Sequence, residues 1–471
     1  MLNKIRYILC LFLFLPILSQ AQNDTIKYDV GFMGVASTGK YAPFWFQSNR
    51  YGLIPASPAS AGIMAGINKD FGAKKKLFDY GFKANLLVQT YGNKTTAYLH
   101  EFYVQARFSV FDLIVGAREE QLGNQDSTLS CGGFLFSKNT RPMPKITLGI
   151  EHFTPVPFTS GFLEVKGAMA HGWFTDNIYA TDLYLHHKYV YAKLGGKLPV
   201  HLQYGFDHVA QWGGSVPVYG QQPASLSDFK DIFFAHAGGK SSTMNDQFNA
   251  LGNHIASQST KLDIELSDFT MSGYWQKISE DGPIKNFWNA PNKADGLWGV
   301  SIRNSKFPYI KGILYEYLQT TDQSGPYLDK DGIIYGGADN YFNNGIYQNG
   351  WTYFSRTIGT PFISSPVYNK DGSVSIENNR VVVHHFGIEG DITGYNYKFL
   401  SSFSKNYGTY SSPFVPYGVK NTSLLLEVNK QFPALLNMEI GCSVGADFGK
   451  LYGNSVGCLF SIRKRGNLFH Y

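Results

Sequence analysis

The stretch that decides the fold, residues 78–120, reads FDYGFKANLLVQTYGNKTTAYLHEFYVQARFSVFDLIVGAREE. From Phe78 to Val88 apolar and aromatic side chains take alternate positions, with polar groups such as Lys83 between them. After a turn-forming Gly-Asn-Lys-Thr sequence the alternation restarts, and Tyr98, Phe102, Val104, Ala106 and Phe108 are expected on the apolar face. Successive side chains of a strand point to opposite faces, so this stretch predicts two strands with one aromatic-rich face and one charged face.

The length and chemistry of these strands favour a membrane-embedded barrel. Each run is about a dozen residues, the length of a strand that crosses a bilayer at a tilt. Aromatic residues make up 16% of the chain and charged residues 16%, whereas ordinary soluble domains carry roughly 25% charged residues. In a membrane barrel the aromatic-rich face of each strand meets lipid and the charged face meets the water-filled interior. We therefore predict an all-β fold, a transmembrane antiparallel β-barrel of one domain.

Counting alternating runs between turn signals predicts about eighteen strands, an even number as single-chain bacterial barrels require. They are expected at 28–38, 61–72, 78–91, 96–110, 112–120, 145–153, 160–173, 183–194, 199–212, 259–266, 268–278, 295–304, 308–319, 381–390, 394–404, 419–430, 434–447 and 453–463. Every second connection is then a short turn, and all the long segments fall at the other end. This separation is typical of outer-membrane barrels, whose periplasmic turns are short.

The N-terminus has the features of a secretory signal. Lys4 and Arg6 precede an apolar run, and Ser19-Gln20-Ala21 is a small-x-small cleavage site. We expect residues 1–21 to be removed and residues 22–471 to form the barrel in the outer membrane of a Gram-negative bacterium, in contact with its lipid. The net charge of +6 comes without a basic stripe interleaved with aromatic residues, so no nucleic-acid partner is expected.

One segment, residues 226–257, departs from the β pattern. Phe229, Ile232 and Phe233 share one face of a possible helix, and a second helix from Asn245 would place Leu251 and Ile255 on one stripe. Such a pair of helices either plugs the lumen or packs on a rim, and the sequence leaves both arrangements open.

Six charged residues are expected to face the lumen, and both signs alternate among them. They are Lys83, Glu101, Arg107, Glu119, Glu151 and Glu164. Because the signs alternate instead of forming one charged ring, we favour a network that braces the wall over a selectivity or ligand-binding surface.

The mature chain contains Cys131, Cys442 and Cys458. A hairpin centred near Lys450 would bring Cys442 and Cys458 opposite each other on the apolar face. We favour two lipid-facing thiols, with a cross-strand disulfide as the alternative because the spacing must also fit disulfide geometry.

Sequence motifs for catalysis or metal binding lack the structural context that the chemistry needs. Gly453-Asn454-Ser455-Val456-Gly457 has nucleophile-elbow spacing but opens a strand instead of a strand-to-helix turn. The His186-His187 and His384-His385 pairs place adjacent rings on opposite faces of a strand. We therefore predict no catalytic residues, no metal ligands and no cofactor.

Two loops combine aromatic rings with amide and guanidinium donors, which suits a sugar: its C–H face stacks and its hydroxyls hydrogen-bond. A loop that packs on its own aromatic residues is the alternative. The candidate polysaccharide-binding residues are Trp288, Asn289, Tyr341, Asn344, Tyr347, Trp351, Tyr353 and Arg356.

Several stretches spread over the mature chain resemble one family. They are residues 41–45 (YAPFW), 161–167 (GFLEVKG), 171–174 (HGWF), 249–254 (NALGNH) and 295–299 (DGLWG). In these the chain resembles the Wzi-like capsule-assembly proteins of Bacteroidetes-type bacteria. The resemblance implies a non-enzymatic, lectin-like outer-membrane barrel, of eighteen strands in the enterobacterial members, that holds capsular polysaccharide at the cell surface. Few residues separate residue 22 from the first expected strand, so we do not expect the helical bundle of those members here.

Together these features predict a surface barrel that binds capsular or other extracellular polysaccharide and helps attach it, with capsule export machinery as a further partner. A porin or sugar channel is the first alternative, and an outer-membrane lipase or protease is the second. A lumen filled by residues 226–257 would argue against the channel.

Overall fold

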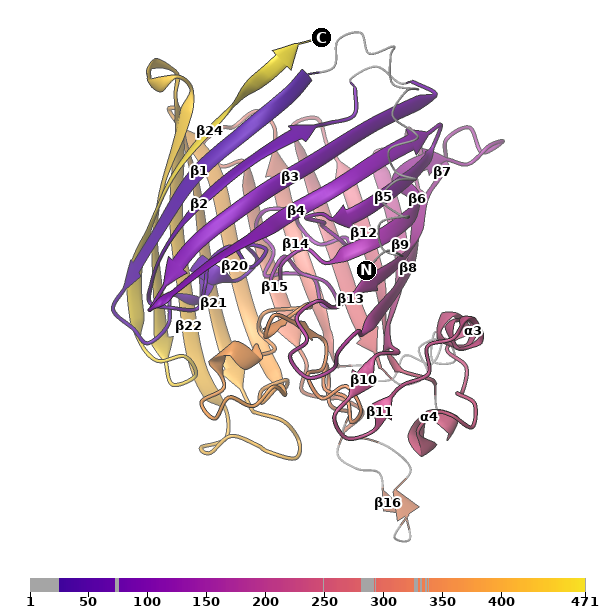
Figure 1. Cartoon of the computed structure of the whole chain (residues 1–471). Helices are drawn as coiled ribbons and strands as arrows, with labels where there is room; N and C mark the ends of the chain where they lie inside the picture. Colours follow the sequence, from indigo (N-terminus) through magenta and orange to yellow (C-terminus); the bar gives the residue numbers. More distant parts are fainter. Residues whose placement is uncertain are drawn as a thin grey trace, which may run out of the picture.

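The computed structural model describes residues 25–72, 76–248, 250–280, 292, 294–325, 329–330, 333–334, 337 and 339–470 of the 471-residue chain. Eighteen long strands form one antiparallel sheet that closes on itself as a barrel (Figure 1). Closure comes from pairing of the first strand with the last, along a register from Thr25 opposite His470 to Ser37 opposite Gly457. The predicted fold and the predicted number of strands are confirmed.

The barrel strands follow each other around the wall in chain order. They are β1 (Thr25–Ser37), β2 (Ala59–Lys69), β3 (Phe78–Tyr91), β4 (Lys94–Phe108), β5 (Phe111–Ala117), β6 (Pro144–Pro155), β7 (Leu163–Trp173), β8 (Tyr184–Leu194), β9 (Val200–Trp212), β12 (Asn253–Glu265), β13 (Phe269–Ser279), β14 (Gly296–Asn304), β15 (Gly312–Gln319), β20 (Val381–Ile392), β21 (Tyr395–Asn406), β22 (Val419–Phe432), β23 (Met438–Gly449) and β24 (Ser455–His470).

Short elements lie in the connections between these strands. They are α2 (Phe44–Gln47), β10 (Ser215–Val216), β11 (Gly220–Gln221), α3 (Leu226–Phe234), α4 (Met244–Phe248), β16 (Asp329–Lys330), β17 (Ile333–Ile334), β18 (Thr352–Tyr353), β19 (Arg356–Thr357), η2 (Pro366–Tyr368) and η3 (Pro433–Leu435). Among the described residues, no helix is both long enough and apolar enough to span a bilayer.

The two ends of the barrel differ as the loop lengths predict. Short turns and both ends of the described chain lie at one end, which we call the inner end, and the long connections lie at the other, the outer end (Figure 1). The longest outer connections are 38–58, 118–143, 213–252 and 320–380. Because outer-membrane barrels keep short turns in the periplasm, the outer end corresponds to the cell exterior.

The 78–120 stretch forms β3, β4 and β5, with one departure from simple alternation. The register between β3 and β4 shifts beside His100, where Asn85 pairs with Glu101 but Leu86 pairs with Leu99. Such a bulge puts two residues of one strand opposite one of the other and reverses the parity beyond it. Our placement of Tyr98 on the apolar face is therefore wrong: Leu99 is exposed there, and the Tyr98 ring lies 3.7 Å from the Arg141 guanidinium.

The outward face of the wall is an apolar belt. Exposed Val, Leu, Ile and Phe side chains recur at alternate positions, as at Leu86, Val88, Val104 and Phe108. Cys442 and Cys458 are free thiols on this face. Their predicted opposition is wrong by two residues, because Cys442 pairs with Phe460 and Cys458 with Val444. The two thiols are diagonal neighbours, and the favoured expectation of lipid-facing thiols matches their exposure.

The outer part of the lumen is filled by three outer connections that fold inward, residues 38–58, 118–143 and 339–380, which we call the plug. In one buried cluster Phe134, Tyr341 and Trp351 of the plug pack with Leu185 and Val209 of the wall. In a second, Phe44, Trp45 and Phe46 of the plug pack with wall residues of strands that include β15, β20, β21, β22 and β24. The hydrophobic core thus lies inside the barrel, between plug and wall.

Residues 226–257 do not fill the lumen. They therefore give no argument against a channel, contrary to the sequence analysis. Helices α3 and α4 lie beside the outer end, outside the wall (Figure 1). The predicted second helix is also too long. Helix α4 ends at Phe248, and Ile255 lies in β12, which begins at Asn253. Packing of Ile255 against the plug core supplies the contacts that make this segment a strand.

Candidate functional site

The aromatic residues predicted to stack on sugar are packed inside the protein. Tyr341, Tyr347, Trp351 and Tyr353 are almost completely buried in the plug core. Burying large aromatic surface stabilises the plug, and the same composition would have suited an open sugar-binding loop. The burial of these four residues fits the sequence alternative of a loop packed on its own aromatic residues.

The polar tips of these rings join two plug segments to each other and join the plug to neighbouring outer connections. Trp351 Nε1 donates to the Leu135 carbonyl at 3.0 Å, and the Tyr347 hydroxyl donates to the Gly213 carbonyl at 3.2 Å. The Tyr353 hydroxyl lies 2.6 Å from Thr175 Oγ1. Buried Tyr and Trp usually find such partners, so these contacts fix where each ring sits.

The remaining loop candidates divide into structural residues and residues outside the described chain. The buried Arg356 guanidinium donates to the Gln47 and Ile54 carbonyls at 3.2 and 2.8 Å, which ties two plug segments together. Asn344 Oδ1 accepts the backbone N–H groups of Ile346 and Tyr347 and so shapes a turn. Trp288 and Asn289 lie outside the described residues.

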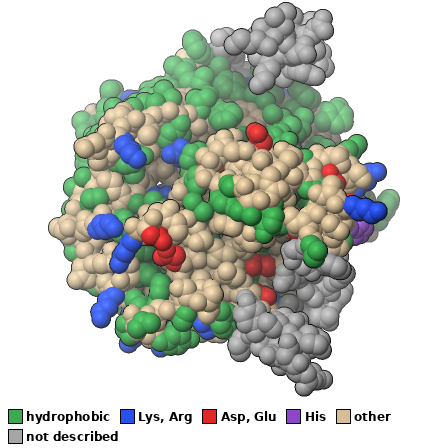
Figure 2. All heavy atoms as spheres, turned by 60° about the horizontal axis from the view of Figure 1, so that its bottom comes forward, with side chains coloured by type: hydrophobic (Ala, Val, Ile, Leu, Met, Phe, Trp, Pro, Cys, Tyr) green, Lys and Arg blue, Asp and Glu red, His purple; other side chains and the backbone are tan. Residues whose placement is uncertain are grey.

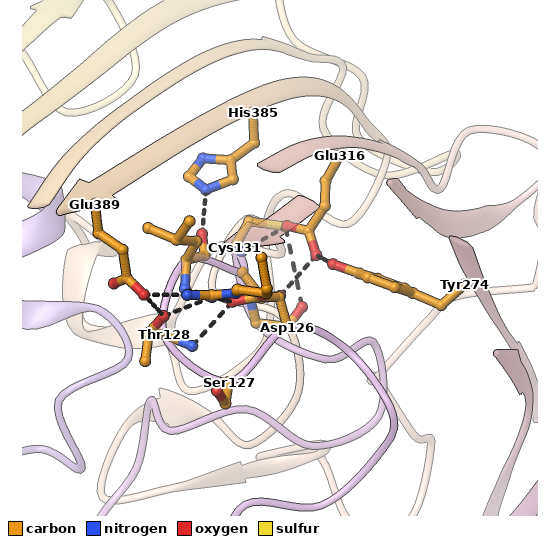
Figure 3. Close-up of polar contacts among 12 residues, drawn as sticks. Asp126, Ser127, Thr128, Cys131, Tyr274, Glu316, His385 and Glu389 are labelled. Carbon is orange, nitrogen blue, oxygen red and sulfur yellow. Dashed lines mark hydrogen bonds and ion pairs between the residues drawn. The ribbon is translucent and has the colours of Figure 1, made fainter. Parts of the chain in front are cut away.

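A polar anchor holds residues 126–131 of the plug to the wall (Figure 3). Glu316 of β15 accepts hydrogen bonds from the Cys131 backbone N–H at 2.6 Å, the Ser130 hydroxyl at 2.7 Å and the Tyr274 hydroxyl. A buried carboxylate is stable only when its oxygens are satisfied in this way. We call Glu316 with its three donors the plug anchor.

Ionic contacts extend the anchor on its inner side. Arg303 of β14 pairs with both Asp126 of the plug and Glu389 of β20, and Thr128 Oγ1 donates to Glu389 Oε1 at 2.7 Å (Figure 3). Burial of Asp126 opposes ionisation, but hydrogen bonds from Arg303 and from the Leu129 and Thr128 N–H groups outweigh it, so its pKa lies below the ordinary value. The charged form therefore stabilises this contact.

A histidine links two of the plug segments. His385 of β20 contacts the Leu129 carbonyl through Nε2 at 2.8 Å and Ser402 Oγ through Nδ1 at 2.7 Å. Trp45 Nε1 donates to the same Ser402 hydroxyl at 3.2 Å. Segments 38–58 and 118–143 thus share one wall contact.

On the inner side of the plug, the lumen opens into a charged cavity that extends toward the inner end of the barrel. One part, of about 340 Å³, lies between plug residues such as Arg50 and Tyr51 and wall residues such as Glu101. A second part, of about 440 Å³, is lined by Lys27, Asp29 and Asp70. Both parts are bordered by Lys83 and Arg463, so they are adjacent.

The six lumen charges predicted from the sequence all have a polar partner, and for Glu119 this partner is a histidine. Lys83 pairs with Glu101, Arg107 with Asp112 at 2.7 Å, Glu119 with His100 at 2.8 Å, Glu151 with Arg118 at 2.7 Å and Glu164 with Lys193. Each pair joins two neighbouring strands, or a strand and the 118–143 connection. Lys83, Glu101 and Glu119 also border the cavity.

The outer surface carries a concentration of basic side chains on one side. Lys and Arg gather toward the left of the outer view, with fewer acidic groups among them (Figure 2). The outer loops and strand ends between β20 and β4 supply Lys40, Lys94, Lys370, Arg380, Lys405, Lys420 and Lys450, against Asp371 and Glu377. This side of the rim therefore carries a positive field toward the cell exterior.

Tyrosine rings lie among these basic groups. The Arg380 guanidinium lies 3.8 Å from the Tyr410 ring centre, and Arg380 also donates to the Tyr417 hydroxyl at 3.4 Å. Tyr417 is 61% exposed and lies 4.8 Å, centre to centre, from Tyr407. We call Arg380, Lys405, Tyr407, Tyr410 and Tyr417 the rim cluster. It offers ring faces, hydroxyls and cations at the outer surface.

The motif residues considered for chemistry have ordinary structural contacts. Ser455 begins β24, and its hydroxyl donates to the Tyr41 carbonyl at 2.8 Å. Within the described ranges, no group of three His, Cys, Asp or Glu side chains is arranged to hold a metal ion.

Comparison with known families identifies the chain. The family model described as capsule assembly protein Wzi matches residues 38–364, which include most of the plug and twelve of the barrel strands. The chain belongs to the Wzi family. No curated protein matches it in a sequence search.

Solved structures show the same fold at low sequence identity. Wzi of Escherichia coli, described as an outer-membrane protein involved in group 1 capsule assembly and a carbohydrate-binding β-barrel, has a TM-score of 0.59 at 13% identity over 92% of this chain and 84% of that one. OccK5 (OpdH) of Pseudomonas aeruginosa has a TM-score of 0.51 at 9% identity over 95% and 99% of the two chains. Both show that this Wzi-family chain shares their fold.

Sequence reasoning missed the residues that position the plug and those that form the rim cluster. Glu316 and His385 occupy inward positions of two predicted strands, so parity could have assigned them to the lumen. The alternation of a strand does not show which residue an inward side chain contacts. The plug residue whose backbone N–H binds Glu316 is 185 residues away in the sequence. The tyrosines of 407–417 show no alternation or motif that separates them from other loop residues.

Proposed function

We propose that this Wzi-family chain is a non-enzymatic, lectin-like protein that binds capsular or other extracellular polysaccharide and helps attach it at the cell surface. Family membership carries the proposal, since the matching family is described by capsule assembly. The description of Escherichia coli Wzi as a carbohydrate-binding barrel supports the same ligand class. In the proposal the chain enters the outer membrane after loss of residues 1–21, its belt contacts lipid, and the capsule export machinery delivers the polysaccharide.

The rim cluster is the proposed contact surface. Sugar rings present C–H faces that pack on aromatic rings, and their hydroxyls hydrogen-bond to tyrosine and arginine. Carboxylates on a polysaccharide would meet Arg380 and the exposed lysines Lys405 and Lys420, where charge-assisted hydrogen bonds are stronger than neutral ones. The buried rings of Tyr341 and Trp351 act in this proposal by fixing the plug beneath that surface.

A channel is the alternative from another functional class. The plug opposes it, because three inward segments with buried aromatic cores lie across the outer part of the lumen. A channel would have to displace them. Conductance measured in planar bilayers separates the two functions, since a channel opens in the absence of capsule and a plugged lectin stays closed.

Binding by purified protein tests the proposal. We expect wild-type protein to bind one or more glycans on an array of capsular polysaccharides. The rim triple variant, Arg380→Ala with Tyr410→Ala and Tyr417→Ala, should lose about tenfold or more in affinity. Tyr219→Ala is the matched control, because Tyr219 is an exposed tyrosine in the outer connection 213–252. Equal binding by all three proteins would overturn the rim assignment, and absence of glycan binding together with open-channel conductance would overturn the function.

A further inference from the structure

The outward wall near the outer end of β8, β9 and β12 carries several polar side chains. His186 and Lys188 share the parity of Val190, which is 55% exposed on the belt. Their neighbours Leu185 and His187 point inward, Leu185 into the plug core and His187 against Phe136. His208 of β9 and His254 of β12 lie on the same outward face, with His208 Nε2 2.9 Å from His254 Nδ1.

Residues 213–252, which we call the outer strap, cover this polar patch. Phe229 and Phe233 of α3 lie against the His186 ring, with ring centres 5.5 and 5.4 Å away. Lys188 Nζ donates to the Phe233 carbonyl and lies 3.8 Å from the centre of its ring. The Leu251 carbonyl contacts His254 Nε2 at 2.7 Å. The patch is therefore buried under the strap and does not face lipid.

The other side of the strap replaces the missing apolar surface. Leu226, Lys230 and Phe234 follow one another at four-residue intervals, so they form one stripe of α3 opposite the face that holds Ile232. Leu226 is 77% exposed and Phe234 54% exposed. Ser225 and Asp228 form a capping box that fixes the start of the helix.

We propose that the outer strap is a lipid-anchoring element whose α3 stripe inserts among the lipids of the outer leaflet. His186 and Lys188 are the third and fifth residues of β8 from its outer end, so the strap lies at the level where the belt meets the head groups. The composition of the stripe, two large apolar residues around one lysine that can reach the head groups, is that of an interfacial helix.

Site-specific fluorescence quenching tests the proposal. An environment-sensitive fluorophore is attached to Phe234→Cys or, separately, Leu226→Cys, in a Cys442→Ser and Cys458→Ser background that retains the buried Cys131. The protein is reconstituted in phosphatidylcholine and phosphatidylglycerol vesicles that contain phosphatidylcholine spin-labelled near the head group. Val190→Cys reports the belt, and Val415→Cys reports water because Val415 is 94% exposed in an outer loop.

We expect the spin-labelled lipid to quench sites 234 and 226 about twofold or more above site 415, and iodide to quench them less than site 415. If spin-labelled lipid and iodide quench sites 234 and 226 to the same extent as site 415, the proposal is overturned. Protection from both quenchers would overturn it as well, because it would place a second protein surface, not lipid, on the stripe. Native barrel migration before heating, measured for every variant, shows that the labelled proteins are folded.

Discussion

The backbone N–H of Cys131 in the plug donates to Glu316 Oε2 on β15 at 2.6 Å, across 185 residues of sequence. With the Ser130 and Tyr274 hydroxyls, it makes Glu316 the acceptor of three donors from plug and wall. Glu316 is therefore one of the wall groups that hold the plug in the lumen. Under the proposed function, a barrel closed in this way would meet polysaccharide at its outer surface instead of passing it through the lumen.

Substitution of Glu316 by Gln should loosen the plug. The amide end of Gln donates where Glu accepts, so at least one of the three donors loses its partner, at a cost of roughly 1–3 kcal/mol. We expect a loss of that size in the free energy of unfolding in urea, together with more frequent openings in planar bilayers. Glu439→Gln is the control, because the Glu439 side chain is 45% exposed. Wild-type stability and a closed trace for Glu316→Gln would argue against the anchor.

Replacing Trp351 by Ala should act on stability first. The ring is fully buried in the plug core, and truncation of a buried Trp costs about 3–5 kcal/mol. The exposed Tyr417→Ala should change stability by no more than about 0.5 kcal/mol while it weakens glycan binding. Urea unfolding and glycan titration of both variants check this contrast. Lost glycan affinity for Trp351→Ala with unchanged stability would mean that the ring contacts sugar directly.

The strands could be predicted from the sequence because alternation is a local property. Phe78, Lys83 and Val88 reveal which side sees lipid without knowledge of any distant residue. The bulge at His100 could not be seen, since it depends on how β3 and β4 pair. The plug was beyond the sequence for a related reason: Trp351 and Tyr341 have the composition of a binding loop, and only contacts with distant wall residues decide that they are buried.

The three thiols of the mature chain should all be free. Cys442 and Cys458 are diagonal neighbours, and diagonal residues of a sheet lie roughly 7–8 Å apart, beyond the usual Cα separation of a disulfide. Alkylation of denatured protein without reductant should therefore add three maleimides by mass spectrometry. In the folded protein Cys131 should stay unmodified. Its burial, and to a smaller extent the nearby charge of Glu316, raises the pKa of its thiol well above the ordinary value. A single adduct after denaturation would show a Cys442–Cys458 bond.

Asp295 should make stability depend on pH. Its buried carboxylate accepts the Asp322 and Gln323 N–H groups, each at 2.8 Å, and burial raises its pKa to about 6. A carboxyl group whose pKa is raised on folding stabilises the fold below its unfolded pKa, and this contribution is lost as the pH rises through about 6. The difference in unfolding free energy between wild type and Asp295→Asn should thus fall by roughly 2–3 kcal/mol from pH 4 to pH 7. A difference that stays constant over this range would refute the assignment.

Capsule retention by living cells tests the central claim most directly. Encapsulated cells would carry the wild-type chain, the rim triple variant or Tyr219→Ala, each inserted in the outer membrane at equal level. Polysaccharide is then measured on the cells and in the medium. The account predicts that the rim triple variant sheds several times more polysaccharide into the medium than the other two proteins. Wild-type retention by the correctly inserted rim triple variant would contradict it.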